Sequence, residues 1–142
     1  MKQFQITYNS DETFIKKLEE IDQWCNTDLT YTTIFRIYSQ DMNLNHICHI
    51  CDILDDRMPE ALYLGCTANA NILDGTLVDA EAILICTVFE YETTKVDILQ
   101  FPFSEENVKE DVQAVKDHCT VNPWVNSAEM HGTIMDMSMK EF

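Results

Sequence analysis

The chain has 142 residues and a net charge of −16, because 9 Lys and Arg stand against 25 Asp and Glu. A surface this acidic repels nucleic-acid phosphates and anionic membranes, which argues against either as a partner. With 46% hydrophobic residues and only three Gly and three Pro, the composition predicts one globular domain over residues 1–142.

The N-terminal segment MKQFQITYNSDET lacks the apolar core of a signal peptide. No apolar run approaches the ~18 residues that a membrane span needs. We therefore predict a cytoplasmic protein, in which the six cysteines stay reduced. Their spacing matches no secreted disulfide framework.

The first half of the chain alternates predicted strands and helices. KQFQITY has the alternation of a half-buried strand, and Ser10 is placed to cap the helix that follows. The apolar stripe of that helix runs through Phe14, Leu18, Ile21 and Cys25. TYTTIFRIYS favours a second strand, a helix is expected over 44–57 before Pro59, and EALYLGC favours a third strand.

The second half is expected to add strands and a third helix. EAILICTVFEYETTKVDILQF is long enough for two strands joined by a turn over 90–94. Ser104 is placed to open a helix that continues to Cys119. GTIMDMSMKEF alternates like a strand, which either pairs within its own sheet or joins two subunits as a homodimer. Together the elements predict an α/β fold, a layered mixed sheet of about 5–6 strands flanked by about 3 helices.

One short segment, HICHIC, concentrates residue types that bind metals or carry redox chemistry: His46, Cys48, His49 and Cys51. On a helix, however, both cysteines fall on an apolar stripe and the two histidines flank it. We therefore interpret the cysteines as core residues, with a metal site as the alternative. No metal ligand and no cofactor is assigned.

A second segment, ALYLGCTANANILDGT, begins as a buried strand and ends in short polar side chains. Ligands of α/β sheets bind beyond the carboxyl ends of strands, and Gly, Thr and Asn offer close approach and hydrogen bonding there. We predict that a small polar ligand is bound by Gly65, Cys66, Thr67, Asn69 and Asn71. The alternative is an ordinary connection that closes with a turn at Asp74 and Gly75.

The same segment resembles the N-terminal FIST domain, a family of bacterial intracellular sensory domains. The resemblance rests on PEALYLGCTANANILDG, on the strand AILICTVFEYETTKV that follows, and on the order of elements upstream. Ala70 and Asn71 stand where the family has Gly and Glu. The resemblance implies a non-enzymatic domain that binds a small ligand, such as an amino acid. It also implies an attached histidine kinase, chemotaxis receptor or cyclic-di-GMP-turnover domain, and hence a larger protein of which the chain is the N-terminal portion.

Two other function classes stay open. One is a protein-interaction or dimerisation domain without a ligand, which would use the Met-rich C-terminal segment and Trp124. The other is a cysteine-dependent hydrolase or transferase centred on Cys66. No Gly-x-Ser-x-Gly elbow, phosphate-binding Gly-rich loop or His-Glu-x-x-His helix is present, so no catalytic residue is assigned.

Overall fold

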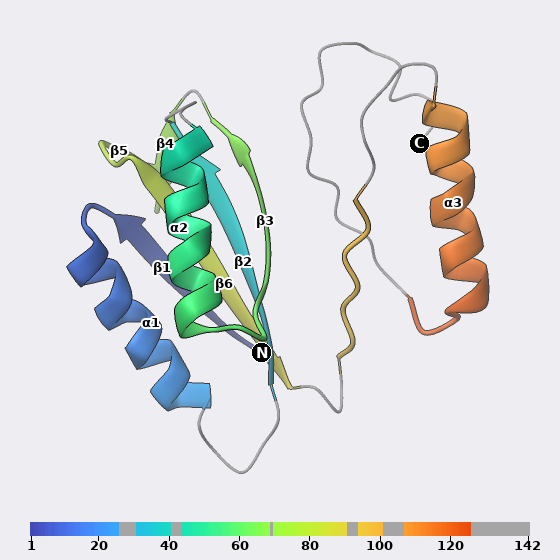
Figure 1. Ribbon diagram of the computed structural model, residues 1–142, viewed down its shortest axis with the longest axis horizontal. Coiled ribbons are helices and arrows are strands. Elements are labelled where there is room, and N and C mark those ends of the chain that lie inside the picture. The colour runs from blue at the N-terminus through green and yellow to red at the C-terminus, as the bar shows by residue number, and fades with distance from the viewer. Residues whose placement is uncertain (26–30, 41–43, 69, 91–93, 101–106, 126–142) are drawn as a thin grey trace. The chain divides into compact units, whose positions relative to one another are not determined.

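The protein is described by a computed structural model that covers residues 1–25, 31–40, 44–68, 70–90, 94–100 and 107–125. The chain divides into two compact units, Met1–Val96 and Asp97–Phe142. The first unit holds the elements β1 (Lys2–Tyr8), α1 (Asp11–Cys25), β2 (Tyr31–Ser39), α2 (Leu44–Arg57), β3 (Leu62–Thr67), β4 (Asn71–Leu73), β5 (Thr76–Val78) and β6 (Ala82–Glu90), as Figure 1 shows. The second unit holds α3 (Val108–Val121).

The first unit contains a mixed four-stranded sheet in the order β1-β6-β2-β3. β6 is antiparallel to both β1 and β2, and β2 is parallel to β3. It follows that β1, β2 and β3 run in one direction and finish at one edge of the sheet. The predicted α/β class is confirmed, and the strands divide into this sheet and a separate two-stranded hairpin, β4-β5.

Helix α1 forms as the sequence predicts. The backbone N–H of Thr13 lies 3.4 Å from the Ser10 hydroxyl, and the N–H of Phe14 donates to the Ser10 carbonyl at 3.0 Å. These contacts satisfy amide groups that the first turn leaves unpaired. The side chains that the helix buries are Phe14, Leu18 and Ile21.

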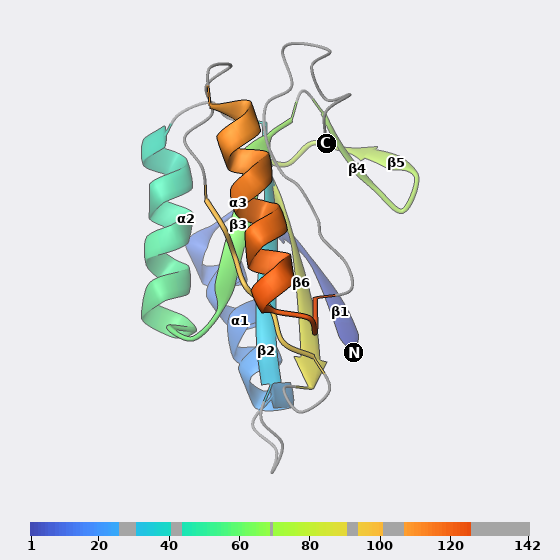
Figure 2. The same ribbon diagram turned by 90° about the vertical axis from the view of Figure 1, so that its right-hand side faces the viewer.

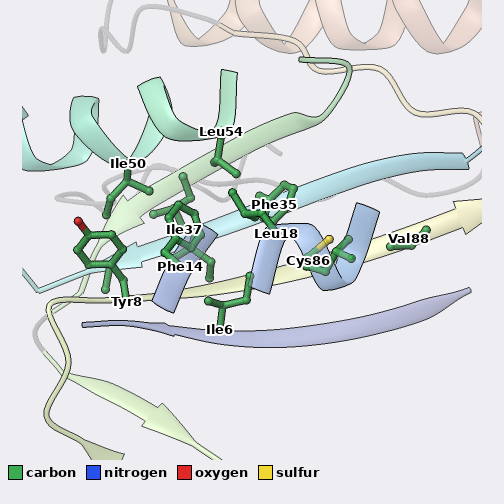
Figure 3. Packing of buried hydrophobic residues seen from close by; sticks show 13 residues of the cluster. Ile6, Tyr8, Phe14, Leu18, Phe35, Ile37, Ile50, Leu54, Cys86 and Val88 are labelled. Atoms are coloured by element: carbon green, nitrogen blue, oxygen red, sulfur yellow. The ribbon is translucent and has the colours of Figure 1, made fainter. Parts of the chain in front are cut away.

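The hydrophobic core lies on the face of the sheet against which α1 and α2 pack (Figure 3). Alternate residues of neighbouring strands meet there in rows, and Leu84 of β6 is opposite both Ile6 and Ile37. The fully buried large side chains include Phe14, Phe35, Leu18, Ile21, Ile50, Leu54, Leu84 and Val88. Burial of this apolar area, at about 25 cal/mol per Å², is the main term that holds the two helices on the sheet.

The buried stripe of α2 differs from the predicted one. Ile50 and Leu54 are fully buried, and His46 lies one turn before Ile50 on the same side. Cys51 is half-buried against the core, but Cys48 is exposed, so the prediction of two core cysteines is wrong for Cys48. The apolar residues of α2 fit two possible stripes that are offset by about one residue. The helix packs against the sheet with the stripe that buries the larger aliphatic side chains.

The β4-β5 hairpin was predicted only as a loop. Its turn residues, Asp74 and Gly75, have φ of 50° and 77°, both positive as a two-residue type I′ turn requires. Leu73 and Thr76 face each other directly across the turn. The hairpin lies at the end of the sheet where β2 and β3 finish (Figure 2). The predicted Asp-Gly turn is therefore present, with three-residue strands on either side.

Two predictions in the second half need correction. Residues 94–100 form no strand, because β1 and β2 already occupy both edges of β6 and leave no place beside it for a hairpin partner. Helix α3 begins at Val108, after Asn107 at the N-cap, and not at Ser104. The predicted C-terminal strand over 132–142 lies outside the described residues, as does Asn69.

Candidate functional site

The topology gathers polar residues at one edge of the sheet. Tyr8, Ser39 and Thr67 end the three strands that share a direction, and β6 starts at the same edge because Ala82 pairs with both Tyr8 and Ser39. The helix that follows each of the first two strands also begins at this edge. Carboxyl ends of strands with helix N-termini beside them form the usual ligand-binding edge of an α/β sheet.

Gly65 has a packing role in β3. A Cβ at this position would lie 2.4 Å from the carbonyl oxygen and 2.9 Å from the Cβ of Ile37 on the neighbouring strand. Real side chains do not approach this closely, so any larger residue forces the two strands apart. The close backbone approach that the sequence suggested is therefore an approach of β2 to β3.

Cys66 and Thr67 lie at the end of β3 on opposite faces of the sheet, because successive side chains of a strand alternate. Thr67 is exposed and pairs with Ser39, whose carbonyl accepts the N–H of Ala68 at 2.7 Å. Cys66 is half-buried on the face away from α1 and α2. The sheet thus separates this thiol from both histidines of α2.

Asn71 is almost completely buried, with 3% of its surface exposed. Its side-chain amide donates to the carbonyl of Ala80 at 3.2 Å. This hydrogen bond therefore joins the first residue of β4 to the chain just after β5, where the two ends of the hairpin meet. Of the five predicted residues, Gly65 and Thr67 share a face at the carboxyl end, Cys66 lies opposite, and Asn71 lies within the hairpin.

A group of titratable side chains that the sequence did not single out as a site meets at the same edge. We call it the carboxyl-end cluster, and it consists of Tyr8, Asp11, His46, His49 and Glu81. The Tyr8 hydroxyl donates to Oδ1 of Asp11. Nε2 of His49 lies 3.0 Å from each carboxylate oxygen of Asp11. These contacts join the end of β1, the start of α1 and the middle of α2.

His46 forms the inner part of the cluster. Its Nε2 lies 3.4 Å from Oε2 of Glu81, which precedes β6, and its ring centroid is 5.2 Å from that of Tyr8. Only 16% of the His46 side chain is exposed, against 62% for Glu81. His46 and His49 are three residues apart on one helix, so their side chains lie on the same side of it. This spacing is the sequence feature that could have indicated the cluster.

The cluster shifts two of its own pKa values. Burial, followed by the hydrogen bond to Asp11 and the charges of Asp11 and Glu81, raises the pKa of Tyr8 to about 12. The hydrogen bond from Tyr8, followed by that from His49, holds the pKa of Asp11 below its usual 3.8. At neutral pH Tyr8 is therefore a phenol donor, and Asp11 is a carboxylate that accepts two hydrogen bonds.

Within the residues that the structure describes, no group of three or more His, Cys, Asp or Glu side chains is placed to hold a metal ion. The described helices include none with the length and hydrophobicity to cross a membrane. The chemistry of the edge is that of hydrogen bonding and charge, supplied by carboxylates, imidazoles and hydroxyls.

Comparison with protein families, with curated proteins and with solved structures finds no match to this chain. The fold defines its class: the residues that the structure describes form an α/β protein with three helices, a mixed four-stranded sheet and a two-stranded hairpin.

Proposed function

We propose that the chain is a ligand-sensing domain that binds a small polar molecule, such as an amino acid, at the carboxyl end of β1, β2 and β3. The observation that carries the proposal is the contact of Tyr8, Asp11 and His49, which come from three elements, at the edge where Thr67 also ends β3. Occupancy of the site would regulate an attached output domain of the histidine kinase, chemotaxis receptor or cyclic-di-GMP-turnover type, as the resemblance to the FIST domain implies. Such a sensor needs only different affinities for its ligand in two conformations.

The exposed groups of this edge complement a zwitterion. The carboxylates of Asp11 and Glu81 are 50% and 62% exposed and can accept hydrogen bonds from an ammonium group. The hydroxyl of Thr67, exposed at the end of β3, can donate to a ligand carboxylate. In this arrangement Gly65 and Asn71 maintain the backbone geometry of the edge. In the sequence, Cys66 directly precedes Thr67, and Asn69 follows it by two positions.

The proposed location is the cytoplasm. All six cysteines carry free thiols, including Cys48, which is exposed. Exposed thiols persist in reducing compartments and are rare in oxidising ones.

The test is a thermal-shift screen of the purified chain with the common amino acids and small polar metabolites, followed by calorimetric titration of each hit. A ligand at 100 times its dissociation constant stabilises the folded state by about 2.7 kcal/mol. Thr67→Val and Asp11→Asn should each weaken binding by about tenfold, because the first removes a hydroxyl donor and the second removes a negative charge and replaces an acceptor oxygen with a donor. The matched control is Thr76→Val, at an exposed position of β5.

Two outcomes contradict the proposal. One is a screen in which no compound raises the melting temperature. The other is a ligand whose affinity is unchanged by Thr67→Val and by Asp11→Asn, since that ligand binds elsewhere.

A second candidate function, dimerisation without a ligand, is favoured by one surface feature. Ile72 and Leu77 face each other across the hairpin and are 68% and 70% exposed. Paired aliphatic side chains left in water are typical of a surface that another protein covers. If two copies of the chain meet there, light scattering gives a dimer mass that the double substitution Ile72→Thr, Leu77→Thr lowers to the monomer. A monomer mass before substitution contradicts this alternative.

A further inference from the structure

Three aromatic side chains gather at the edge of the sheet opposite the carboxyl-end cluster. Phe4 comes from β1, Trp24 from the last turn of α1, and Tyr31 is the first residue of β2. The start of β1, the end of α1 and the start of β2 lie at the same end of the first unit (Figure 1). All three rings are half-buried and pack against the hydrophobic core, so the core holds them in place.

The rings of Phe4 and Trp24 meet nearly at a right angle. Their centroids are 6.0 Å apart, and their planes are inclined at 72°. Tyr31 packs against Trp24, with the ring centroids 5.2 Å apart, and supports it. The face of an aromatic ring carries negative potential, so two inclined rings form adjoining walls that both attract a cation.

A cation of the chain itself lies over both rings. Lys2 is two residues before Phe4 and therefore on the same face of β1. Its Nζ is 4.7 Å from the centroid of Phe4 and 4.8 Å from that of Trp24. Both distances are within the ~6 Å over which a ring face attracts a cation. Two rings thus act on one positive charge at this position.

The surroundings of the rings also favour a positive charge. The last turn of α1 ends in carbonyl groups that carry partial negative charge, and it contains Asp22 and no basic residue. The net charge of −16 attracts cations from solution. The ammonium group of Lys2 is exposed and strongly hydrated, so water competes with the rings for it. A trimethylammonium group carries the same charge on an apolar surface, which loses less hydration when it contacts the rings.

We propose that Phe4 and Trp24 form a second binding site, for a small cation that carries a trimethylammonium group, and that Lys2 occupies this site when the ligand is absent. The site is at the opposite end of the sheet from Thr67, so it is independent of the amino-acid site proposed above. The ligand displaces the exposed side chain of Lys2 into water. Lys2 is therefore a competitor of the ligand, and its removal should strengthen binding.

The test is a titration of the full chain with choline chloride at constant ionic strength, followed by tryptophan fluorescence. The chain has two tryptophans, and Trp124→Phe in the second unit leaves Trp24 as the reporter. We expect a saturable change with a roughly millimolar dissociation constant, which Lys2→Gln lowers by about threefold to tenfold. The neutral isostere 3,3-dimethyl-1-butanol should bind at least about tenfold more weakly than choline.

Two further variants test the place of binding and the effect of charge. Phe4→Leu keeps an apolar side chain against the core but removes one ring, so it should weaken choline binding to the Lys2→Gln chain by about threefold or more. Lys109→Gln removes the same charge as Lys2→Gln at an exposed position of α3, and it should leave the affinity unchanged.

Three outcomes overturn the proposal. The first is a Lys2→Gln chain in which choline causes no saturable change in the fluorescence of Trp24. The second is equal binding of choline and the neutral alcohol, since the rings then act only as an apolar surface. The third is an affinity for choline that Phe4→Leu leaves unchanged, since choline then binds elsewhere.

Discussion

The side-chain amide of Asn71 donates a hydrogen bond to the backbone carbonyl of Ala80 at 3.2 Å, and this contact closes the base of the β4-β5 hairpin. Asn71→Ala removes the donor and leaves the Ala80 carbonyl without it in a buried position. We expect the free energy of unfolding to fall by about 1–2 kcal/mol, as measured by urea unfolding. Asn71→Asp, which keeps the shape but lacks the amide donor, should also destabilise the fold. The control Asn9→Ala, at an exposed position, should change it by less than about 0.5 kcal/mol.

Gly65 and Gly75 are predicted to respond differently to substitution. Gly65→Ala places a Cβ 2.4 Å from the Ile37 carbonyl oxygen, so the strands must move apart, at a cost of about 1–3 kcal/mol. Gly75 has open space around it, and only its φ of 77° restricts the side chain. Asn tolerates that conformation, so Gly75→Asn should cost less than about 1 kcal/mol. Urea unfolding of the two variants gives the comparison, and a Gly65→Ala protein as stable as the unsubstituted chain contradicts the close contact.

The two helices and the four sheet strands of the first unit were predictable because each has a strong local pattern. Phe14, Leu18 and Ile21 repeat at helical spacing, and the predicted bounds of α2 match those observed. The strand pairing was not predictable, since alternation shows that a segment is a strand but not which strand lies beside it. The sequence does not show that β6 lies between β1 and β2. This pairing leaves no free edge of β6 for the hairpin partner expected over 94–100. Each strand of the β4-β5 hairpin has only three residues, too few for a pattern to appear.

The candidate site was predictable only in its place along the chain. The sequence indicated the end of β3, and Thr67 lies there, exposed. Tyr8 and Glu81 come from segments far apart in the sequence, and they meet His46 only after the sheet has formed. A linear pattern cannot indicate such a meeting. His46 was further hidden by the shift of the α2 stripe, which places it on the buried side.

The cysteines should differ in their rates of alkylation. Burial raises the pKa of Cys51, and raises that of Cys86 to about 12, so both thiols hold their protons and are also shielded. Cys48 is exposed on the outer side of α2. Mass spectrometry of the folded protein during iodoacetamide treatment at pH 8 should therefore find Cys48 modified before Cys51, and Cys86 last. Modification of Cys86 as fast as Cys48 contradicts the described core.

The hydrogen bond between Tyr8 and Asp11 should appear in acid unfolding. A carboxyl group whose pKa is lowered by folding contributes stability above its unfolded pKa, and the contribution is lost as the pH falls through the folded pKa. Tyr8→Phe removes the largest cause of the lowered pKa of Asp11, so this pKa should return toward 3.8 and acid unfolding should begin at a higher pH. Carbon-13 titration of the carboxyl group, with circular dichroism of the fold, measures both effects. Tyr63→Phe, which removes a tyrosine hydrogen bond to Asp55, is the control and should leave Asp11 unchanged.

The place of β6 in the sheet has a consequence for how the chain acquires its structure during synthesis. β6 is the last of the four sheet strands to leave the ribosome, yet it lies between β1 and β2, and Tyr8 pairs with Ala82. Until Ala82–Glu90 has emerged, β1 with α1 has no sheet to join, and β2 keeps one unpaired edge. Long-range pairing of this kind closes late and slowly, and the nascent chain meanwhile presents apolar strands to its surroundings. A nascent chain that stalls before residue 82 therefore holds β1 apart from the β2-β3 pair, and both expose apolar strand surface to which a chaperone can bind.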